Sequence, residues 1–222
     1  MTALTNFDRK TATPQGLTHR QLALWQWAYA DVDVRRHFME STKAQDGPQT
    51  PYLCPFEVLL KHGNFYTPQA LPKCYGLGRP KACFYNSGLL AVKSQRFRRR
   101  PKLTYVEGLA LWHSIPIHHG WCVTDEGMVV DVTWRFTPEE VPHMAYFGVP
   151  FQSHAWDEMH LLTQQTSILD DWANRHPICQ VPYDFANPRP YLDRVRDAVE
   201  EAQDRAWNNE ERIRRQQEAF AP

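Results

Sequence analysis

The chain has 222 residues, of which 42% are hydrophobic and 13% aromatic, so its apolar surface suffices for a core without metal or disulfide support. This length suits one domain with extensions. Lys and Arg together number 25, as do Asp and Glu, which excludes a global field that attracts nucleic acid or an anionic membrane. Function must therefore come from a local site.

The polar N-terminus lacks the basic and then apolar pattern of a secretion signal, and no apolar stretch approaches the ~20 residues of a membrane span. We therefore expect a cytoplasmic protein without membrane contact. The five cysteines form an odd set in a reducing compartment, so free thiols are expected.

The first half of the chain predicts mostly helices. Residues 1–16 indicate a flexible tail. Thr18 and Gln21 form a capping-box pattern, and the apolar spacing that follows predicts a helix over 18–39. A polar loop over 41–54 leads to a short apolar segment at 56–61 that fits one or two helical turns.

The middle of the chain predicts one helix and then three strands. A buried helix is expected over 83–94, despite a cost of roughly 1 kcal/mol for Gly88. A basic turn over 96–102 precedes an alternating strand at 103–112. Two further strands, 119–124 and 128–134, flank Asp125-Glu126-Gly127, which is typical of a tight hairpin.

The last third predicts a turn from Pro138, an aromatic segment at 146–151 and a helix over 156–174. A long helix with a narrow apolar stripe follows over 190–219. The stripe allows two arrangements, docking on its own domain or forming a homodimer through this helix. The domain plan is a tail (1–16), a main domain (17–189) and a charged C-terminal helix (190–222).

Three side chains have the local settings of a thiol catalytic site. Cys83 opens a helix, whose positive end favours a thiolate. His119 opens an apolar strand, and Asp131 is a carboxylate in an apolar run that must be paired to be tolerated. The hairpin brings His119 and Asp131 together, so that one imidazole nitrogen can take the thiol proton while the other donates to Asp131. Cys and His are also common as inert interior residues.

The segment 81–134 resembles the core of the transglutaminase-like superfamily of papain-like thiol enzymes. That pattern is a Cys opening a helix, a strand, His-Ala-Trp on a second strand and Asp on the next. Here these are Cys83, the strand 105–110, His119-Gly120-Trp121 and Asp131. The chain departs from it with Gly120 in place of Ala and Val132 where Pro often follows the Asp. The resemblance implies an α+β fold with a papain-like core, in which a helix packs on a small antiparallel sheet, with added N- and C-terminal helices.

The resemblance also implies acyl transfer. The thiol attacks an amide or ester carbonyl, and water or an amine resolves the acyl-enzyme, with the Cys83 N–H as a natural oxyanion donor. Peptidase, amidase, deamidase and transglutaminase-like hydrolase or acyltransferase activities share this machinery, so the substrate is a protein, a peptide or a small amide. The residues that we expect to bind it are Tyr105, Glu107, Trp121 and Trp134. Glu107 can instead pair with an Arg, and the two Trp can instead belong to the core.

Several other His and Cys residues are less suited to these roles than His119 and Cys83. His118 neighbours His119 but faces the other side of its strand, and His154-Ala155-Trp156 lacks a following strand with an acid. Cys122 lies on the opposite strand face from His119 and fits the core. The remaining cysteines lack zinc-site spacing, so we expect no metal and no cofactor.

Two alternative functions remain open. One is a catalytically silent member of the fold that binds a protein or a nucleic acid. The other is a thiol enzyme acting on a nucleotide or small metabolite. Both rest on the basic loop 96–102, although such loops are usually solvated charge, so nucleic acid is not the expected partner.

Overall fold

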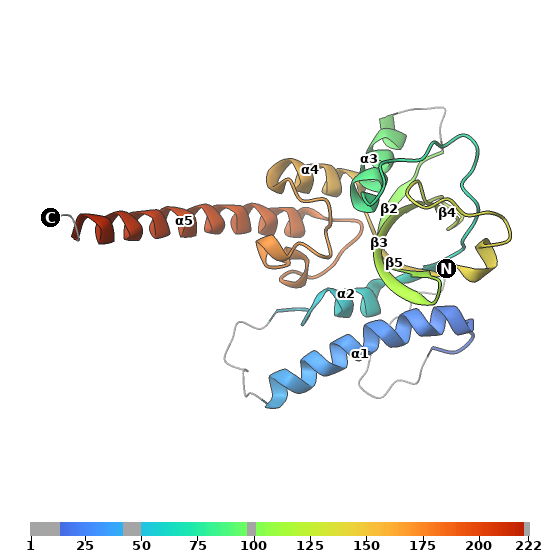
Figure 1. Ribbon diagram of the computed structural model, residues 1–222, viewed down its shortest axis with the longest axis horizontal. Coiled ribbons are helices and arrows are strands. Elements are labelled where there is room, and N and C mark those ends of the chain that lie inside the picture. The colour runs from blue at the N-terminus through green and yellow to red at the C-terminus, as the bar shows by residue number, and fades with distance from the viewer. Residues whose placement is uncertain (1–13, 42–49, 97–100, 220–222) are drawn as a thin grey trace.

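The structure is a computed structural model that describes residues 14–41, 50–96 and 101–219. It is a mixed α+β fold in which helices surround one curled antiparallel sheet (Figure 1). None of the helices in these ranges combines the length and apolar character needed to cross a membrane. The expected tail lies almost wholly outside the described residues, as does most of the basic loop.

The N-terminal helices α1 (His19–Ser41) and α2 (Pro55–His62) pack beside each other below the sheet (Figure 1). The predicted capping box is confirmed: the Thr18 N–H donates to Gln21 Oε1 at 3.0 Å, and the Gln21 N–H donates to Thr18 Oγ1 at 3.3 Å. Leu24, Ala28 and Val32 are fully buried. The helical spacing of these apolar residues therefore fixes α1 to the core.

The sheet has the strand order β1-β5-β2-β3-β4, with every pair antiparallel. Its strands are β1 (Asn64–Tyr66), β2 (Thr104–Trp112), β3 (Ile115–Val123), β4 (Val129–Val130) and β5 (Tyr146–Phe151). Its two edges meet, because the Thr67 N–H donates to the Gly127 carbonyl at 3.0 Å and the Val129 N–H donates to the Thr67 carbonyl at 2.9 Å. The curl therefore brings the segment after β1 next to the start of β4.

The curled sheet separates two apolar clusters. The inner cluster contains strand and loop side chains, including Tyr66, Val106, Trp121 and Tyr146. The outer cluster joins the other sheet face to all of the long helices. Because side chains alternate along a strand, neighbouring residues enter different clusters. This alternation decides which functional side chains can meet.

Helices α3 (Cys83–Arg96) and α4 (Ser153–Thr163) pack together on the outer face. The helix predicted over 156–174 is wrong in both bounds. It begins earlier and ends at Thr163, where Gln164 adopts a left-handed conformation with φ 58°. Beyond it, the backbone N–H groups of Ile168 and Leu169 donate to the buried Glu107 carboxylate, so this segment cannot continue as a helix.

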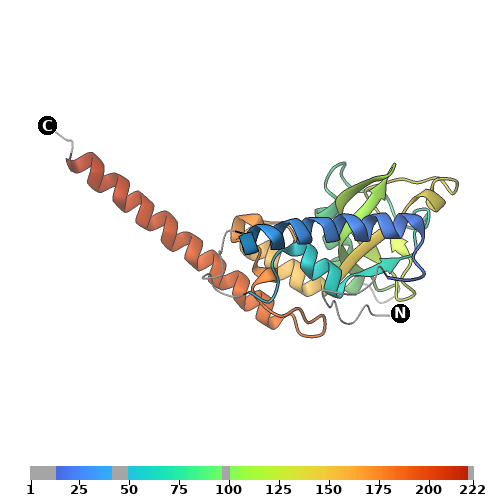
Figure 2. The same cartoon turned by 90° about the horizontal axis from the view of Figure 1, so that it is seen from below.

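Helix α5 (Arg189–Ala219) begins on the domain and then projects away from it (Figures 1 and 2). Leu192, Val195 and Ala198 are buried, whereas Trp207 is 69% and Ile213 42% exposed. Only the first part of the predicted stripe therefore docks on its own domain.

Candidate catalytic site

The N-terminus of α3 is held tightly against β3. The Ser87 hydroxyl donates to the Gly120 carbonyl at 2.9 Å, and the Cys122 thiol donates to the Ser87 carbonyl at 3.1 Å. Gly120 permits this approach, because a Cβ there would lie 2.9 Å from Phe84 Cδ1 and 3.1 Å from Phe84 Cα. The packing places Cys83, the first residue of α3, beside His119, which precedes Gly120.

His119 and Asp131 form a buried pair. The imidazole Nε2 lies 2.7 Å from Asp131 Oδ2, and the two residues are 2% and 3% exposed. The predicted hairpin is present, but its strands differ from the prediction. β3 begins at Ile115, so His119 lies within this strand instead of opening it, and β4 is only Val129–Val130 instead of 128–134. β3 pairs with β4 next to a turn in which Gly127 has φ 79°. Asp131 follows β4 directly and so reaches back to the level of His119.

Every other contact of the Asp131 carboxylate favours its charged form. Oδ1 accepts the backbone N–H groups of Thr133 at 2.9 Å and Trp134 at 3.1 Å, and Oδ2 also accepts the Tyr146 hydroxyl at 2.9 Å. Burial, the largest single influence, would raise the pKa of Asp131, but the His119 charge and these hydrogen bonds lower it. The carboxylate therefore stays ionised and fixes the ring of His119.

The Cys83 side chain lies close enough to His119 to raise the pKa of its ring, and it is itself only partly buried. Because Asp131 occupies Nε2, Nδ1 is the nitrogen available to the thiol. Burial is the strongest influence on the pKa of His119 and lowers it, yet Asp131 and Cys83 together raise it to about 9. At neutral pH the ring is thus an imidazolium that can stabilise an adjacent thiolate.

The four predicted substrate-binding residues lie in different surroundings. Trp134 stacks on the His119 ring, while Trp121 is fully buried in the inner cluster. Tyr105 and Glu107 are fully buried on the outer face. Glu107 accepts hydrogen bonds from Tyr105 and Ser167 and from two backbone N–H groups. Of the four, only Trp134 is both partly exposed and in contact with the His119 ring.

The rival side chains are separated from this site. His118 faces the outer side, where its ring lies 5.0 Å from Phe84 and near Glu107 and Asp170. His154 lies on α4 rather than on a strand. Burial raises the pKa of the Cys54, Cys122 and Cys179 thiols, that of Cys179 to about 12, so they stay protonated. Cys74 is the one exposed thiol among the described residues.

Two residues that support the site were not predicted. Tyr146 is the second side chain, after His119, that hydrogen-bonds to the Asp131 carboxylate. Asn86 accepts the Arg79 N–H at 3.0 Å and donates to the Arg79 carbonyl at 2.8 Å and to Thr133 Oγ1 at 3.1 Å. It therefore ties the loop before Cys83 to the segment after Asp131. Nothing in the sequence marks Tyr146, because its role depends on β5 pairing with β2.

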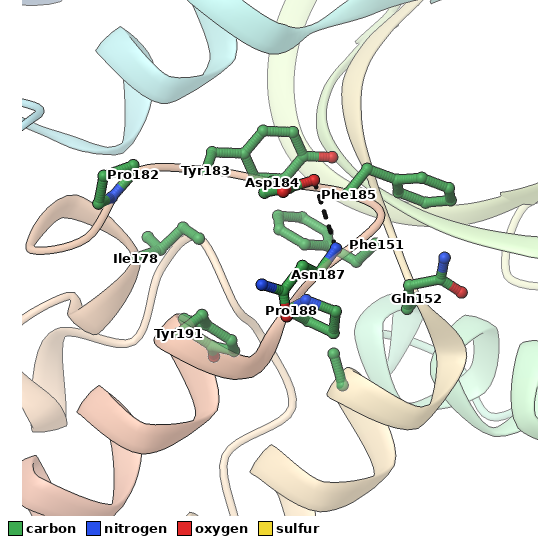
Figure 3. A pocket seen from close by; sticks show the side chains of 11 residues that line it. Phe151, Gln152, Ile178, Pro182, Tyr183, Asp184, Phe185, Asn187, Pro188 and Tyr191 are labelled. Carbon is green, nitrogen blue, oxygen red and sulfur yellow. Dashed lines mark hydrogen bonds between the residues drawn. The ribbon is translucent and has the colours of Figure 1, made fainter.

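A separate small hollow lies at the start of α5, where Phe151, Ile178, Tyr183 and Tyr191 contribute to its wall (Figure 3). Its free volume is about 20 Å³. That is room for a single water molecule, so it cannot hold a substrate.

Comparison of the chain with family models, curated proteins and solved structures gives no match. Among the described residues, no group of three or more His, Cys, Asp or Glu side chains is placed to hold a metal ion. The chemistry of the site is therefore argued from the thiol, the imidazole and the carboxylate themselves.

Proposed function

We propose that this protein is a cysteine-dependent hydrolase or acyltransferase that acts on an amide-type bond. The observation that carries the proposal is the buried 2.7 Å His119–Asp131 contact, which orients the ring beside Cys83, the thiol that helps to raise the pKa of that ring. A thiol, a base and a group that orients the base are the parts that nucleophilic acyl transfer needs.

The proposed reaction has two half-steps. In the proposed resting state His119 is an imidazolium that already carries the Cys83 proton on Nδ1, and the thiolate attacks the substrate carbonyl carbon to give a tetrahedral oxyanion. The C–N bond then breaks, the departing amine takes the proton from Nδ1, and a thioester remains on Cys83. Water attacks the thioester while His119 removes its proton, which releases the acid and restores the thiol; an amine acceptor gives a new amide instead.

The oxyanion is proposed to bind at the start of α3. The N–H groups in the first turn of a helix lack intrahelical partners. The Cys83 N–H lies in that turn beside the attacking sulfur. It is therefore the proposed oxyanion donor, and the positive end of α3 adds to the stabilisation.

We further propose that the fold is papain-like, of the transglutaminase-like kind. This rests on the order of a Cys-bearing helix, a strand, a His-bearing strand and an Asp, together with packing of α3 on the antiparallel strand β3. The substrate class within amide chemistry stays open between peptides, proteins and small amides. The nucleotide alternative depended on the basic loop 96–102, most of which lies outside the described residues.

The decisive experiment is acylation by p-nitrophenyl acetate. Attack by the Cys83 thiolate forms an acetyl thioester and expels p-nitrophenolate. We therefore expect an initial burst of one equivalent of p-nitrophenolate per chain, and an acetyl group on Cys83 detected by mass spectrometry. Cys74→Ala is the matched control, because Cys74 is the one exposed thiol among the described residues and has no imidazole partner among the described contacts. It should leave the burst unchanged, whereas Cys83→Ala should abolish it.

His119→Ala tests the activation itself. Its folded state is checked by circular dichroism, and its acylation rate should fall by about a hundredfold or more, the usual contribution of a general base. If Cys83 in the wild-type protein acylates no faster than Cys74, the enzyme proposal fails and a catalytically silent binding module remains.

A further inference from the structure

A second and much larger hollow lies between the helices away from the thiol. Its free volume is about 510 Å³, and it is walled by α1, the start of α2, the segment 170–180 and α5. None of Cys83, His119 and Asp131 lines it. A volume of this size suits a small metabolite, since ligand pockets usually hold about 300 to 1,000 Å³.

Three guanidinium groups from three different parts of the chain line this hollow: Arg35 of α1, Arg175, and Arg194 of α5. The positive charges of two of them are already paired with carboxylates. Arg35 Nε lies 2.7 Å from Asp31 Oδ2, and Arg194 lies 3.0 Å from Glu201. Arg175 is exposed and makes no ion pair with any residue in the described ranges.

The carboxylates in the wall do not neutralise Arg175. Asp170 interacts with His118 at 3.8 Å, and this contact lowers the pKa of Asp170, so its negative charge is engaged there. Glu201 is engaged with Arg194. The hollow therefore presents one guanidinium that makes no ion pair within the described ranges, and two paired guanidiniums in the same wall.

The backbone that presents Arg175 is strained. Arg175 and His176 have φ values of 60° and 49°, two successive left-handed conformations that residues other than glycine adopt at a cost. The turn is held by hydrogen bonds from the Arg175 N–H to the Trp172 carbonyl at 3.0 Å and from the His176 N–H to the Asp171 carbonyl at 2.8 Å. Such strain concentrates at ligand sites.

We propose that this hollow binds a small anionic molecule through a phosphate or carboxylate group. Arg175 is the principal anion-binding residue, and Arg35 and Arg194, each already paired with a carboxylate, lie in the same wall. Guanidinium forks bind both kinds of anion in a bidentate manner. The site is independent of the thiol chemistry, because a Cys83→Ala protein keeps every residue named here.

The test is isothermal titration of the Cys83→Ala protein with inorganic phosphate and, separately, with citrate. Saturable binding of at least one at roughly millimolar or tighter Kd is expected, and the stronger of the two identifies the preferred group. Arg175→Gly should weaken that binding by roughly tenfold or more while its thermal midpoint stays the same or rises, because glycine relieves the strain.

Gln164→Gly is the matched control. Gln164 is also a left-handed, exposed residue with φ 58°, but it does not line the hollow. This variant should gain stability in the same way and keep full anion binding. Arg175→Gln serves as a second variant that keeps the β-carbon. Absence of saturable binding of either anion, or equal binding by wild type and both Arg175 variants, would overturn the proposal.

Discussion

The indole of Trp134 lies flat against the imidazole of His119, with ring centroids 3.8 Å apart and planes inclined by 10°. Trp134 is only partly buried, whereas His119 is 2% exposed, so the indole covers the imidazole from solvent. An aromatic face also stabilises a cation, by about 0.5–2 kcal/mol. Trp134 therefore supports the imidazolium form as well as the position of the ring.

Replacing Trp134 tests this stacking. Trp134→Leu should slow acylation of Cys83 and move the alkaline limb of the pH–rate profile down by up to about 1 unit, because the imidazolium loses its aromatic partner. Trp134→Phe retains a ring and should shift the limb by less. Identical profiles for wild type and Trp134→Leu would show that the indole does not act on the charge of His119.

The pH dependence of stability should carry the signature of the His119–Asp131 pair. The folded-state pKa of His119 is raised from 6.5 to about 9. This pKa shift contributes on the order of 3 kcal/mol to the free energy of unfolding. The contribution is fully present below about pH 6.5 and is lost as the pH rises through about 9. Unfolding by urea at a series of pH values between these limits measures it.

Asp131→Asn provides the comparison, because other groups also titrate in this range. Without the carboxylate charge, the largest influence that raises the pKa of His119 is lost, so burial should lower this pKa. The difference in unfolding free energy between wild type and Asp131→Asn should thus shrink with rising pH. A difference that stays constant from roughly pH 6 to pH 10, the range that spans the two pKa values, would mean that His119 is neutral in the folded protein.

Gly120→Ala should impair activity more than stability. The added Cβ would meet Phe84 at 2.9 Å and 3.1 Å, so the first turn of α3 must move by a few tenths of an ångström, and Cys83 moves with it. Catalytic geometry is sensitive to such shifts. We expect an acylation rate about tenfold or more lower. Gly76→Ala is the control, since a Cβ there meets no atom within 4 Å; equal rates for the two variants would contradict the prediction.

Much of the site could be predicted because it depends on local patterns. The Asp125–Gly127 turn and the alternation along β3 are short-range signals, and together they bring His119 to Asp131. The surroundings of Glu107 could not be predicted, because its partners Ser167, Ile168 and Leu169 lie about 60 positions away. The same long-range contact explains why α4 ends at Thr163, although the sequence predicted a helix that continues to residue 174.

Gly88 illustrates the same limit. In the sequence Gly88 is only a glycine in a helix interior, where its entropic cost predicts that Gly88→Ala stabilises the helix. In the structure a Cβ there would lie 2.0 Å from Cε2 of Trp156, which is 1% exposed and cannot retreat. Gly88→Ala should therefore destabilise the fold by about 1–3 kcal/mol or more, measured by urea unfolding. A stabilised variant would show that α3 and α4 can separate freely.

Truncation of α5 tests how much of this helix belongs to the domain. A chain ending after Gln203 keeps the buried Leu192, Val195 and Ala198 and removes the exposed Trp207 and Ile213. Because the removed part buries little on its own domain, the thermal midpoint should change by no more than about 2 °C, while the helical circular dichroism signal falls. The full chain should show the same midpoint at every protein concentration. A midpoint that rises with concentration in the full chain, and no longer does so after truncation, would instead indicate a homodimer through this helix.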